Sequence, residues 1–408
     1  MRKTLGAVAI FAFVLAGSTQ PGAGPEAAPE DVLFLRTSGG ITLVRARPKG
    51  VAVNLSEAVP STDWSAVVQA VRDEDRTRLL TLDSVSGDHL WSRDVDRKLE
   101  VKIASEDGRL VALGPRGATG YAGGRSSTTL VIVGADAPEP KTIELAGNYE
   151  PEAFSTDGDS LFVVEYLPPT DPTRYRVRRL DLRTEEVVGV YTVDAELQEA
   201  MEGTARVQAS SPDGRRLYTL YTVAGPGGTR RAFVHVLSLD ELWAHCVDLP
   251  PAFETASERS IAIAVAPDGR RLYVADADTG TVAEVDTEAL AVTRTVQAAF
   301  GSRGGTAHGA VGSDGRLYLG KGSGLSSLDV STLSAGRSWE MAGRITGIQV
   351  ANDGGRVYVG LKDRIVVLDS ATGETLGELD PANVGSIAQL GQSTRSLEEE
   401  RTEIECAC

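Results

Sequence analysis

The sequence lacks the residue patterns that mark most metal, disulfide and phosphate sites. It has 3 cysteines and 4 histidines in 408 residues. Three cysteines are too few for a disulfide framework, and neither a Cys-x-x-Cys nor a His-x-x-x-His pair gives the usual spacing of a zinc site. The Gly-Lys-Ser/Thr loop that binds phosphates and the Gly-x-Ser-x-Gly turn of serine hydrolases are also missing. We therefore expect no metal site of familiar spacing, and the sequence identifies no cofactor.

Basic and aromatic residues are scarce as well. Lys and Arg number 41 against 57 Asp and Glu, which gives a formal net charge of −16, and aromatic residues make up 5% of the chain. An acidic protein repels a phosphate backbone, so we expect no nucleic-acid partner. No long helical period occurs either. From Asp31 onward short apolar runs alternate with turn-forming residues, which is typical of β-strands.

What the chain does contain is a short stretch that occurs seven times. Its clearest copy, residues 266–274, reads Ala-Pro-Asp-Gly-Arg-Arg-Leu-Tyr-Val and combines a tight turn with the start of a strand. The first copy, residues 61–64, is decayed and has tryptophan in place of the glycine. The spacing of 39 to 56 residues indicates repeats of one supersecondary unit. The turn aspartates are Asp63, Asp107, Asp157, Asp213, Asp268, Asp314 and Asp353.

Each repeat predicts a meander of four antiparallel strands, named a to d from the inside of the fold outward. In the clearest copy they cover residues 261–265, 272–275, 281–285 and 292–296. Strand c ends in Leu-Asp or Val-Asp in five copies, and this carboxylate is placed to accept hydrogen bonds from the amides of the next turn. Four-stranded meanders that recur every 40 to 50 residues or so are the signature of a β-propeller. The five aspartates are Asp83, Asp181, Asp286, Asp329 and Asp369.

The two ends of the repeat region predict one further, composite blade. Residues 32–35, 41–44 and 51–54 have the pattern of strands b, c and d, and residues 386–390 that of a lone strand a. Pairing them closes the ring and covers two sheet edges. The expected fold class is therefore all-β, a β-propeller of eight four-stranded blades, or of seven if the decayed first copy is not a full blade.

One known family carries a similar stretch. Pro-Asp-Gly-Arg-Arg-Leu-Tyr-Val-Ala at residues 267–275, followed by Val-Asp-Thr at 285–287, resembles the YVTN/PD40-type, WD40-like repeats of bacterial β-propellers. The resemblance covers residues 31 to about 390 and implies the propeller fold. Propellers of this kind include lactonase-like enzymes and extracytoplasmic binding proteins, so the resemblance leaves the activity open.

The two ends of the chain predict export and a free tail. Residues 1–18 have the positive start, apolar core and small residues of a secretory signal peptide. Leu15-Ala16-Gly17-Ser18 is similar to a lipoprotein box in which serine replaces the lipidated cysteine. We therefore expect a free secreted or periplasmic protein with no membrane span after cleavage; the alternative is an uncleaved signal anchor. Residues 19–30 form a linker, residues 31–391 the propeller, and residues 392–408 a disordered acidic tail.

The three cysteines receive separate interpretations. Cys246 lies in a strand-like run, where we expect burial as a small hydrophobic residue. Cys406 and Cys408 end the tail, and two exposed thiols there are suited to a soft metal ion or an intermolecular disulfide.

Connection lengths indicate which face of the ring is functional. In an up-and-down meander the b–c and d–a connections emerge on one face, and every long connection is of these two kinds. Binding residues of rigid scaffolds are concentrated on such loops; loops that drifted in length without function are the alternative. The same face receives the first residues of the a strands, which line the central channel.

Counting back from the turn aspartates brings charged and polar residues to similar heights at the channel mouth. Neighbouring carboxylates and cations shift each other's pKa values, as groups in functional sites often do. A solvated salt-bridge rim is the alternative interpretation. The candidate ligand-binding residues are Glu100, Lys102, Glu150, Glu152, Arg206, Gln208 and His308.

These observations favour an exported, non-catalytic, monomeric propeller that binds a protein or a small polar ligand through its loop-rich face. The first alternative is a lactonase-like or metal-dependent hydrolase that uses the mouth carboxylates with His308. The second is a structural protein of the cell envelope. The sequence alone names no catalytic residue.

Overall fold

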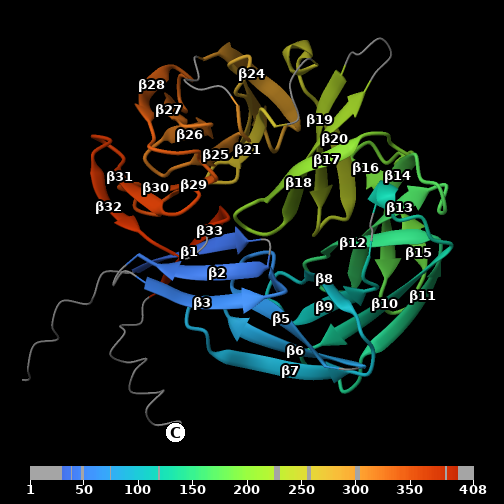
Figure 1. Cartoon of the computed structure of the whole chain (residues 1–408). Coiled ribbons are helices and arrows are strands. Elements are labelled where there is room, and N and C mark those ends of the chain that lie inside the picture. Colours follow the sequence, from blue (N-terminus) through green and yellow to red (C-terminus); the bar gives the residue numbers. More distant parts are fainter. Residues whose placement is uncertain are drawn as a thin grey trace, which may run out of the picture. The chain divides into compact units, whose positions relative to one another are not determined.

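The computed structural model describes residues 30–393, with gaps at 38, 47–49, 74, 118–119, 225–229, 255–258, 299–303 and 382–383. Glu30–Ser393 is one compact unit. Its strands form eight antiparallel sheets that follow one another around a common axis (Figure 1). The fold is therefore an all-β propeller with eight blades. The predicted signal peptide, the linker up to residue 29 and residues 394–408 of the predicted tail lie outside the described residues.

The blades are numbered in chain order, and the strands of each blade are given from the axis outward. Blade 1 contains β33 (Ser386–Ser393), β1 (Glu30–Thr37), β2 (Gly40–Arg45) and β3 (Gly50–Ser56). Blade 2 contains β4 (Ala58–Pro60), β5 (Ala66–Asp73), β6 (Arg76–Asp83) and β7 (His89–Val95). Blade 3 contains β8 (Glu100–Ala104), β9 (Leu110–Gly114), β10 (Ser127–Gly134) and β11 (Lys141–Ala146). Blade 4 contains β12 (Asn148–Phe154), β13 (Ser160–Leu167), β14 (Arg174–Asp181) and β15 (Val187–Gly189).

The second half of the ring repeats this order. Blade 5 contains β17 (Thr204–Ser210), β18 (Arg216–Ala224), β19 (Arg230–Ser238) and β20 (Trp243–Asp248), with β16 (Tyr191–Thr192) outside them. Blade 6 contains β21 (Ile261–Val265), β22 (Arg271–Asp276), β23 (Thr281–Asp286) and β24 (Ala291–Gln297). Blade 7 contains β25 (His308–Val311), β26 (Arg316–Lys321), β27 (Gly324–Asp329) and β28 (Ala335–Glu340). Blade 8 contains β29 (Gly347–Val350), β30 (Arg356–Gly360), β31 (Ile365–Asp369) and β32 (Thr375–Leu379).

Blade 1 is composite, as the sequence predicts. Strand β33, from the end of the propeller, pairs antiparallel with β1, from Glu30 opposite Ser393 to Arg36 opposite Ser386. Strands β2 and β3 complete the same sheet. The ring is thus closed by backbone hydrogen bonds between the first and last strands, which pair the facing edges of β1 and β33.

Four of the seven turns share one hydrogen-bond pattern around a serine. In blade 4 the Ser155 hydroxyl donates to Asp157 (2.6 Å) and accepts from the Ser160 amide (3.0 Å). Six of the turns place glycine at φ between 69° and 74°. In the decayed first copy Trp64 adopts the same left-handed conformation, at φ 63°, and its ring packs 5.4 Å from that of Phe34. A non-glycine residue is strained there, yet the turn forms and blade 2 is complete.

The aspartates at the ends of the c strands also accept the predicted hydrogen bonds. At the end of β31, Asp369 accepts hydrogen bonds from the amides of Ala371 (3.0 Å) and Thr372 (2.7 Å). These amides hold the pKa of the Asp369 carboxyl below its usual value. The same pair of amide bonds is made by Asp83, Asp181, Asp286 and Asp329.

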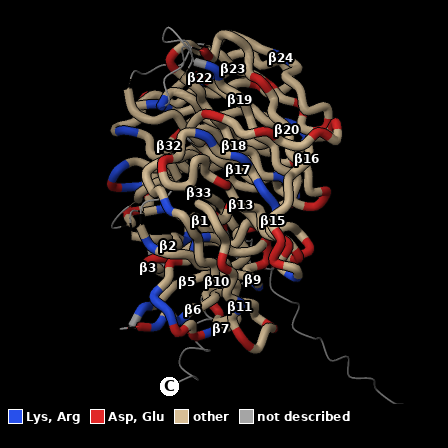
Figure 2. The backbone as a smooth tube through the Cα atoms, turned by 90° about the vertical axis from the view of Figure 1, so that its right-hand side faces the viewer, with Lys and Arg blue, Asp and Glu red and all other residues tan. Residues whose placement is uncertain are grey.

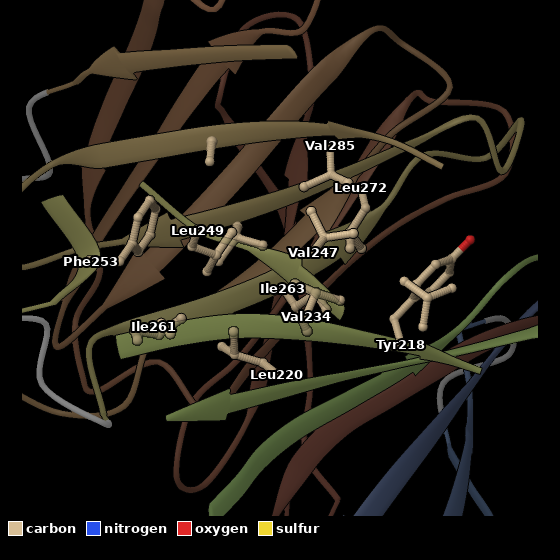
Figure 3. Packing of buried hydrophobic residues seen from close by; sticks show 14 residues of the cluster. Tyr218, Leu220, Val234, Val247, Leu249, Phe253, Ile261, Ile263, Leu272 and Val285 are labelled. Carbon is tan, nitrogen blue, oxygen red and sulfur yellow. The ribbon is translucent and has the colours of Figure 1, made fainter. Parts of the chain in front are cut away.

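The hydrophobic core lies between successive blades. Figure 3 shows one such contact, where Leu220 and Val234 of blade 5 face Ile261 and Ile263 of blade 6. Full burial of one such side chain contributes about 1.5–3 kcal/mol. Aromatic residues that recur in the b strands are fully buried in these contacts, which makes them part of the packing between blades: Phe162, Tyr218, Tyr273, Tyr318 and Tyr358.

One element was not predicted. After β15 the chain crosses to the outside of blade 5, where β16 pairs parallel with β20 before the chain returns to the axis. Residues 190–203 are called the crossover segment below. The run Val187 to Val193 is almost wholly β-prone, so it supplies both the last strand of blade 4 and this added strand.

Candidate functional site

Four innermost strands carry a β-bulge. In three of them the extra residue is charged, and in the fourth, β33 of blade 1, it is Ala388. The pairing with the b strand shifts at Lys102 of β8, at Glu152 of β12 and at Arg206 of β17. The innermost strands of blades 6, 7 and 8 pair without a shift. A bulge bends its strand and redirects a side chain. In blades 3 to 5 the a strand therefore carries a charged side chain at a bulge, whereas the a strands of blades 6 to 8 carry no bulge.

Three of the predicted residues meet at the rim of blades 3 and 4. Lys102 Nζ lies 3.4 Å from a Glu100 carboxylate oxygen and 4.0 Å from one of Glu150. Lys102 and Glu150 are mostly buried, whereas Glu100 is exposed. The Glu150 carboxylate also pairs with Arg125, which sequence analysis did not select. Both rim cations described here are thus neutralised by carboxylates.

Arg125 is positioned by the b–c loops of blades 3 and 4. Its amide donates to the Pro169 carbonyl (2.8 Å), and its guanidinium donates to the Tyr149 carbonyl (2.6 Å). Asn148 is fully buried and donates to both loops, at Gly123 (3.0 Å) and Pro169 (3.2 Å). These hydrogen bonds hold the b–c loops of blades 3 and 4 together on the loop-rich face. The residues that they join are far apart in the chain.

Glu152 and Gln208 form the adjoining part of the rim, between blades 4 and 5. Gln208 Nε2 donates to Glu152 (2.7 Å) and lies 3.2 Å from the Thr219 hydroxyl. Burial raises the pKa of Glu152 to about 7, and the Gln208 hydrogen bond offsets only part of this shift. Among the described side chains, no lysine or arginine forms an ion pair with Glu152. This carboxyl therefore changes charge near neutral pH.

Tyrosine rings lie next to Glu152. Burial, and then the charge of Glu152, raises the pKa of the Tyr166 and Tyr221 hydroxyls. Tyr221 stacks on Tyr175 with 5.0 Å between ring centroids and both are buried, while Tyr121 meets Tyr166 edge-on at 5.5 Å. Tyr121 is 36% exposed, so the outermost of these rings is accessible to a ligand.

The other two predicted residues are placed differently. The Arg206 side chain lies outside the described residues, so only its backbone position at the β17 bulge is known. His308 begins β25 in blade 7, and blade 6 lies between it and the Glu152 part of the rim. Burial lowers the pKa of His308 to about 4, so its imidazole is neutral at physiological pH. The structure thus separates His308 from the carboxylates.

The residues that sequence analysis missed come from loops and from b and c strands. Arg125 and Tyr121 lie in or beside the b–c loop of blade 3, where η1 (Gly120–Ala122) forms, and Tyr166 lies near the end of β13. Counting back from a turn aspartate reaches only a strands, so it could not find them. The one local signal is Gly120. A Cβ on this residue would lie 3.2 Å from the Tyr166 hydroxyl, so glycine leaves room for that ring.

Charge and metal-binding groups limit what the rim can hold. Figure 2 shows acidic and basic residues interspersed along the turns and strand ends. Within the described ranges, no group of three or more His, Cys, Asp or Glu side chains is placed to hold a metal ion. No helix of the same residues is long and apolar enough to cross a membrane. Among the rim carboxylates, Glu152 is one for which the described side chains supply no cation.

No protein-family model and no curated protein matches the sequence. Solved structures match it in fold. Apo AztD from Citrobacter koseri superposes with a TM-score of 0.52 at 13% identity, over 90% of this chain and 100% of AztD. Dihydro-heme d1 dehydrogenase NirN in complex with DHE gives a TM-score of 0.52 at 16% identity, over 88% of this chain and 74% of NirN. At these identities the likeness shows the propeller fold alone.

Proposed function

We propose that this propeller is a binding protein that holds a small ligand with a positively charged amino group at its channel mouth. The observation that carries the proposal is the Glu152 carboxyl, whose pKa is raised to about 7 by burial and whose described hydrogen-bond donor is a neutral amide. A partly buried carboxylate without a cation is costly. A ligand ammonium group would supply the missing charge.

The neighbouring groups suit the same ligand chemistry. Aromatic faces attract organic cations, and Tyr121 and Tyr166 lie beside Glu152. Burial and the charge of Glu202 raise the pKa of Tyr121 to about 12, which places a second carboxylate near the outer ring. Because Lys102 and Arg125 already pair with Glu150, the charge left uncompensated among the described rim side chains is negative. An anionic ligand would be repelled.

Binding is favoured over hydrolysis by the placement of His308. The hydrolase alternative requires this imidazole near the mouth carboxylates, whereas His308 belongs to blade 7 and Glu152 to blade 4. Burial alone lowers the pKa of His308, with no contribution from a carboxylate charge. The described rim of blades 3 to 5 therefore has acids and tyrosines but no histidine paired with them.

The affinity test uses isothermal titration calorimetry with a panel of choline, spermidine and lysine, and with acetate and glucose as anionic and neutral comparisons. We expect an ammonium compound to bind, and Glu152→Gln to weaken that binding at least about tenfold, since a charge-assisted contact is worth about 1.5–3 kcal/mol. Glu100→Gln is the control, because Glu100 is exposed and pairs with Lys102. Binding of acetate or glucose alone, or equal affinities for both variants, would contradict the proposal.

We also propose that the chain is exported and is a WD40-like propeller of the YVTN/PD40 repeat type. The support is the three-part pattern of residues 1–18 and the turn stretch at residues 267–275. Expression in a bacterial host should release a protein whose first residue lies near Thr19. Recovery of Met1 on a cytoplasmic pool, as read by N-terminal sequencing, would refute export.

A further inference from the structure

A group of soft donor atoms lies between blades 4 and 5, on the crossover segment. The Met201 and Tyr175 backbones exchange two hydrogen bonds, of 2.6 and 2.9 Å, and the Gln198 amide donates to the Val190 carbonyl (2.9 Å). These bonds place Gln198 and Met201 against β19 and β20 of blade 5. None of the residues involved belongs to the proposed ligand contacts at the rim.

Three different donor groups converge there. Cys246 Sγ lies 3.7 Å from Met201 Sδ. Gln198 Nε2 lies 3.7 Å from the same Sδ and 2.7 Å from His235 Nε2. His235 and Cys246 stand directly opposite each other in β19 and β20, so their side chains lie on one face of the blade. The Gln198 amide thus lies between the imidazole and the thioether, and the thiol contacts the thioether.

The Gln198 amide takes the place of a cation in this group. Its Nε2 directs hydrogens at the lone pairs of the imidazole and the thioether, which are the lone pairs a metal ion would use. Its Oε1 is buried and has no hydrogen-bond partner within the described part of the chain. Buried polar atoms without a partner are rare. An ion that displaced this amide would release an oxygen from an unfavourable environment.

The imidazole is ready to coordinate. His235 is 2% exposed, and its Nε2 accepts a hydrogen bond from the Gln198 amide (2.7 Å). A ring nitrogen that accepts a hydrogen bond offers the lone pair that a metal ligand needs. Cys246, by contrast, is an exposed residue, which corrects the expectation that it is buried. It lies on the outermost regular strand of the blade, where alternate side chains face solvent.

We propose that Cys246, Met201 and His235 bind a soft monovalent metal ion, Cu(I) above all. Thiolate and thioether ligands select Cu(I), and imidazole suits copper as well. Metal–sulfur bonds of about 2.3 Å at an angle of about 110–120° hold two sulfurs about 3.8–4.0 Å apart. The observed separation of 3.7 Å between Cys246 Sγ and Met201 Sδ is close to this value. Two sulfurs at nearly this separation and the imidazole opposite Cys246 would supply three ligands.

Binding exchanges a proton for the ion without a change of oxidation state. The Cys246 thiol gives up its proton when the metal–sulfur bond forms, so one proton is released per ion bound. The exposed cysteine is the first ligand that an arriving ion meets, and buried His235 is the last.

The test uses the full chain with Cys406→Ser and Cys408→Ser, which removes the other two thiols of the sequence. Cu(I) is offered without oxygen in competition with bathocuproine disulfonate. We expect one equivalent of Cu(I) to move to the protein with release of one proton. Cys246→Ser should weaken binding at least about 100-fold, and Met201→Leu and His235→Asn about 10-fold or more each, the size of effect typical of metal-site residues. His245→Asn, opposite Val236 on the other face, is the matched control.

X-ray absorption at the copper edge separates the possible outcomes. The parent should show two sulfur scatterers and one nitrogen scatterer, and His235→Asn should lose the nitrogen. No uptake by the parent, or equal uptake by Cys246→Ser, would overturn the proposal. Binding that survives both Met201→Leu and His235→Asn unchanged would mean a lone thiol and would overturn it too. Met201→Leu nearly conserves volume, so the test stands even if His235→Asn does not fold.

Discussion

The hydroxyl of Tyr358 donates a 2.6 Å hydrogen bond to the carboxylate of Asp31, 327 residues earlier in the chain. Arg356 pairs with the same carboxylate at 2.9 Å, and Asp31 is 1% exposed. Asp31 lies in β1 of blade 1, and both partners lie in β30 of blade 8. A buried ion pair therefore holds the start of the propeller to blade 8. This contact adds to the pairing of β1 with β33 inside blade 1.

Replacement of Asp31 by asparagine should be strongly destabilising. Removal of one partner of a buried ion pair leaves the other charge uncompensated and costs about 3–5 kcal/mol. Arg356 keeps a second, exposed partner in Asp353, so we expect the low end of this range. Asp353→Asn is the control and should change the free energy of unfolding by less than about 1 kcal/mol. Urea unfolding of both variants makes the comparison, and equal effects would show that the buried pair carries no special weight.

Deletion of β33 should open the ring. Without residues 386–393 the inner edge of β1 has no partner, and an exposed edge promotes association between chains. Deletion of residues 394–408 leaves every described strand in place, so its melting temperature should match that of the whole chain. Thermal melts and light scattering distinguish the two truncations. Identical behaviour would argue against closure through blade 1.

The pKa of Glu152 predicts a pH-dependent effect of Glu152→Gln. The carboxyl titrates near 7 when folded and near 4.3 when unfolded. Between these two pH values the folded protein keeps the Glu152 proton, whereas the unfolded chain loses it. The stability contributed by this group therefore falls as pH rises from about 4 to 7. The glutamine variant should match the parent near pH 4 and be more stable near pH 8, by about 1–3 kcal/mol.

Glu150→Gln is the matched control for this pH effect. Glu150 pairs with Lys102 and Arg125, so its loss should lower stability near pH 8. Urea unfolding at both pH values measures the difference. Parallel pH profiles for the parent and Glu152→Gln would refute the raised pKa.

The serine of the repeated turn should be worth a measurable amount of stability. Ser155→Ala removes the acceptor of the buried Ser160 amide and the donor to Asp157. A buried donor left without a partner costs about 1–3 kcal/mol. Ser313→Ala in blade 7 is the comparison, because Ser313 is exposed and donates to the Asn352 carbonyl. If chemical denaturation gives equal shifts for the two alanine variants, the serine does not stabilise the turn.

Local chemistry explains why so much of the fold was predictable. Each turn carries its own aspartate, and each blade its own alternation, so the blade count and the pairing of residues 386–390 with β1 could be predicted from short stretches. The β-bulges at Lys102 and Glu152 and the parallel strand β16 could not. They depend on contacts between strands, which a single strand's pattern does not record.

The candidate site was predictable only along the a strands. Glu100, Lys102 and Glu150 do meet, because neighbouring a strands run side by side around the axis. Arg125 reaches the same carboxylate from a loop, and its position depends on Asn148 of the next blade. His308 lies six residues before its turn aspartate, a count between those of Glu150 and Glu152, but it stands on a distant blade. Height along a strand can be read from spacing, whereas position around the ring determines which groups meet.

The composite blade also determines when the chain can finish folding. During synthesis β1 leaves the ribosome early, but its partner β33 is among the last described residues to appear. A nascent propeller therefore exposes the β1 edge for almost the whole of translation, a state prone to association. Because Glu30 and Ser393 stand opposite each other, a circular permutant that joins these ends and opens between blades 4 and 5 would make β33 and β1 consecutive. Such a permutant should bury this edge earlier and need less assistance from chaperones.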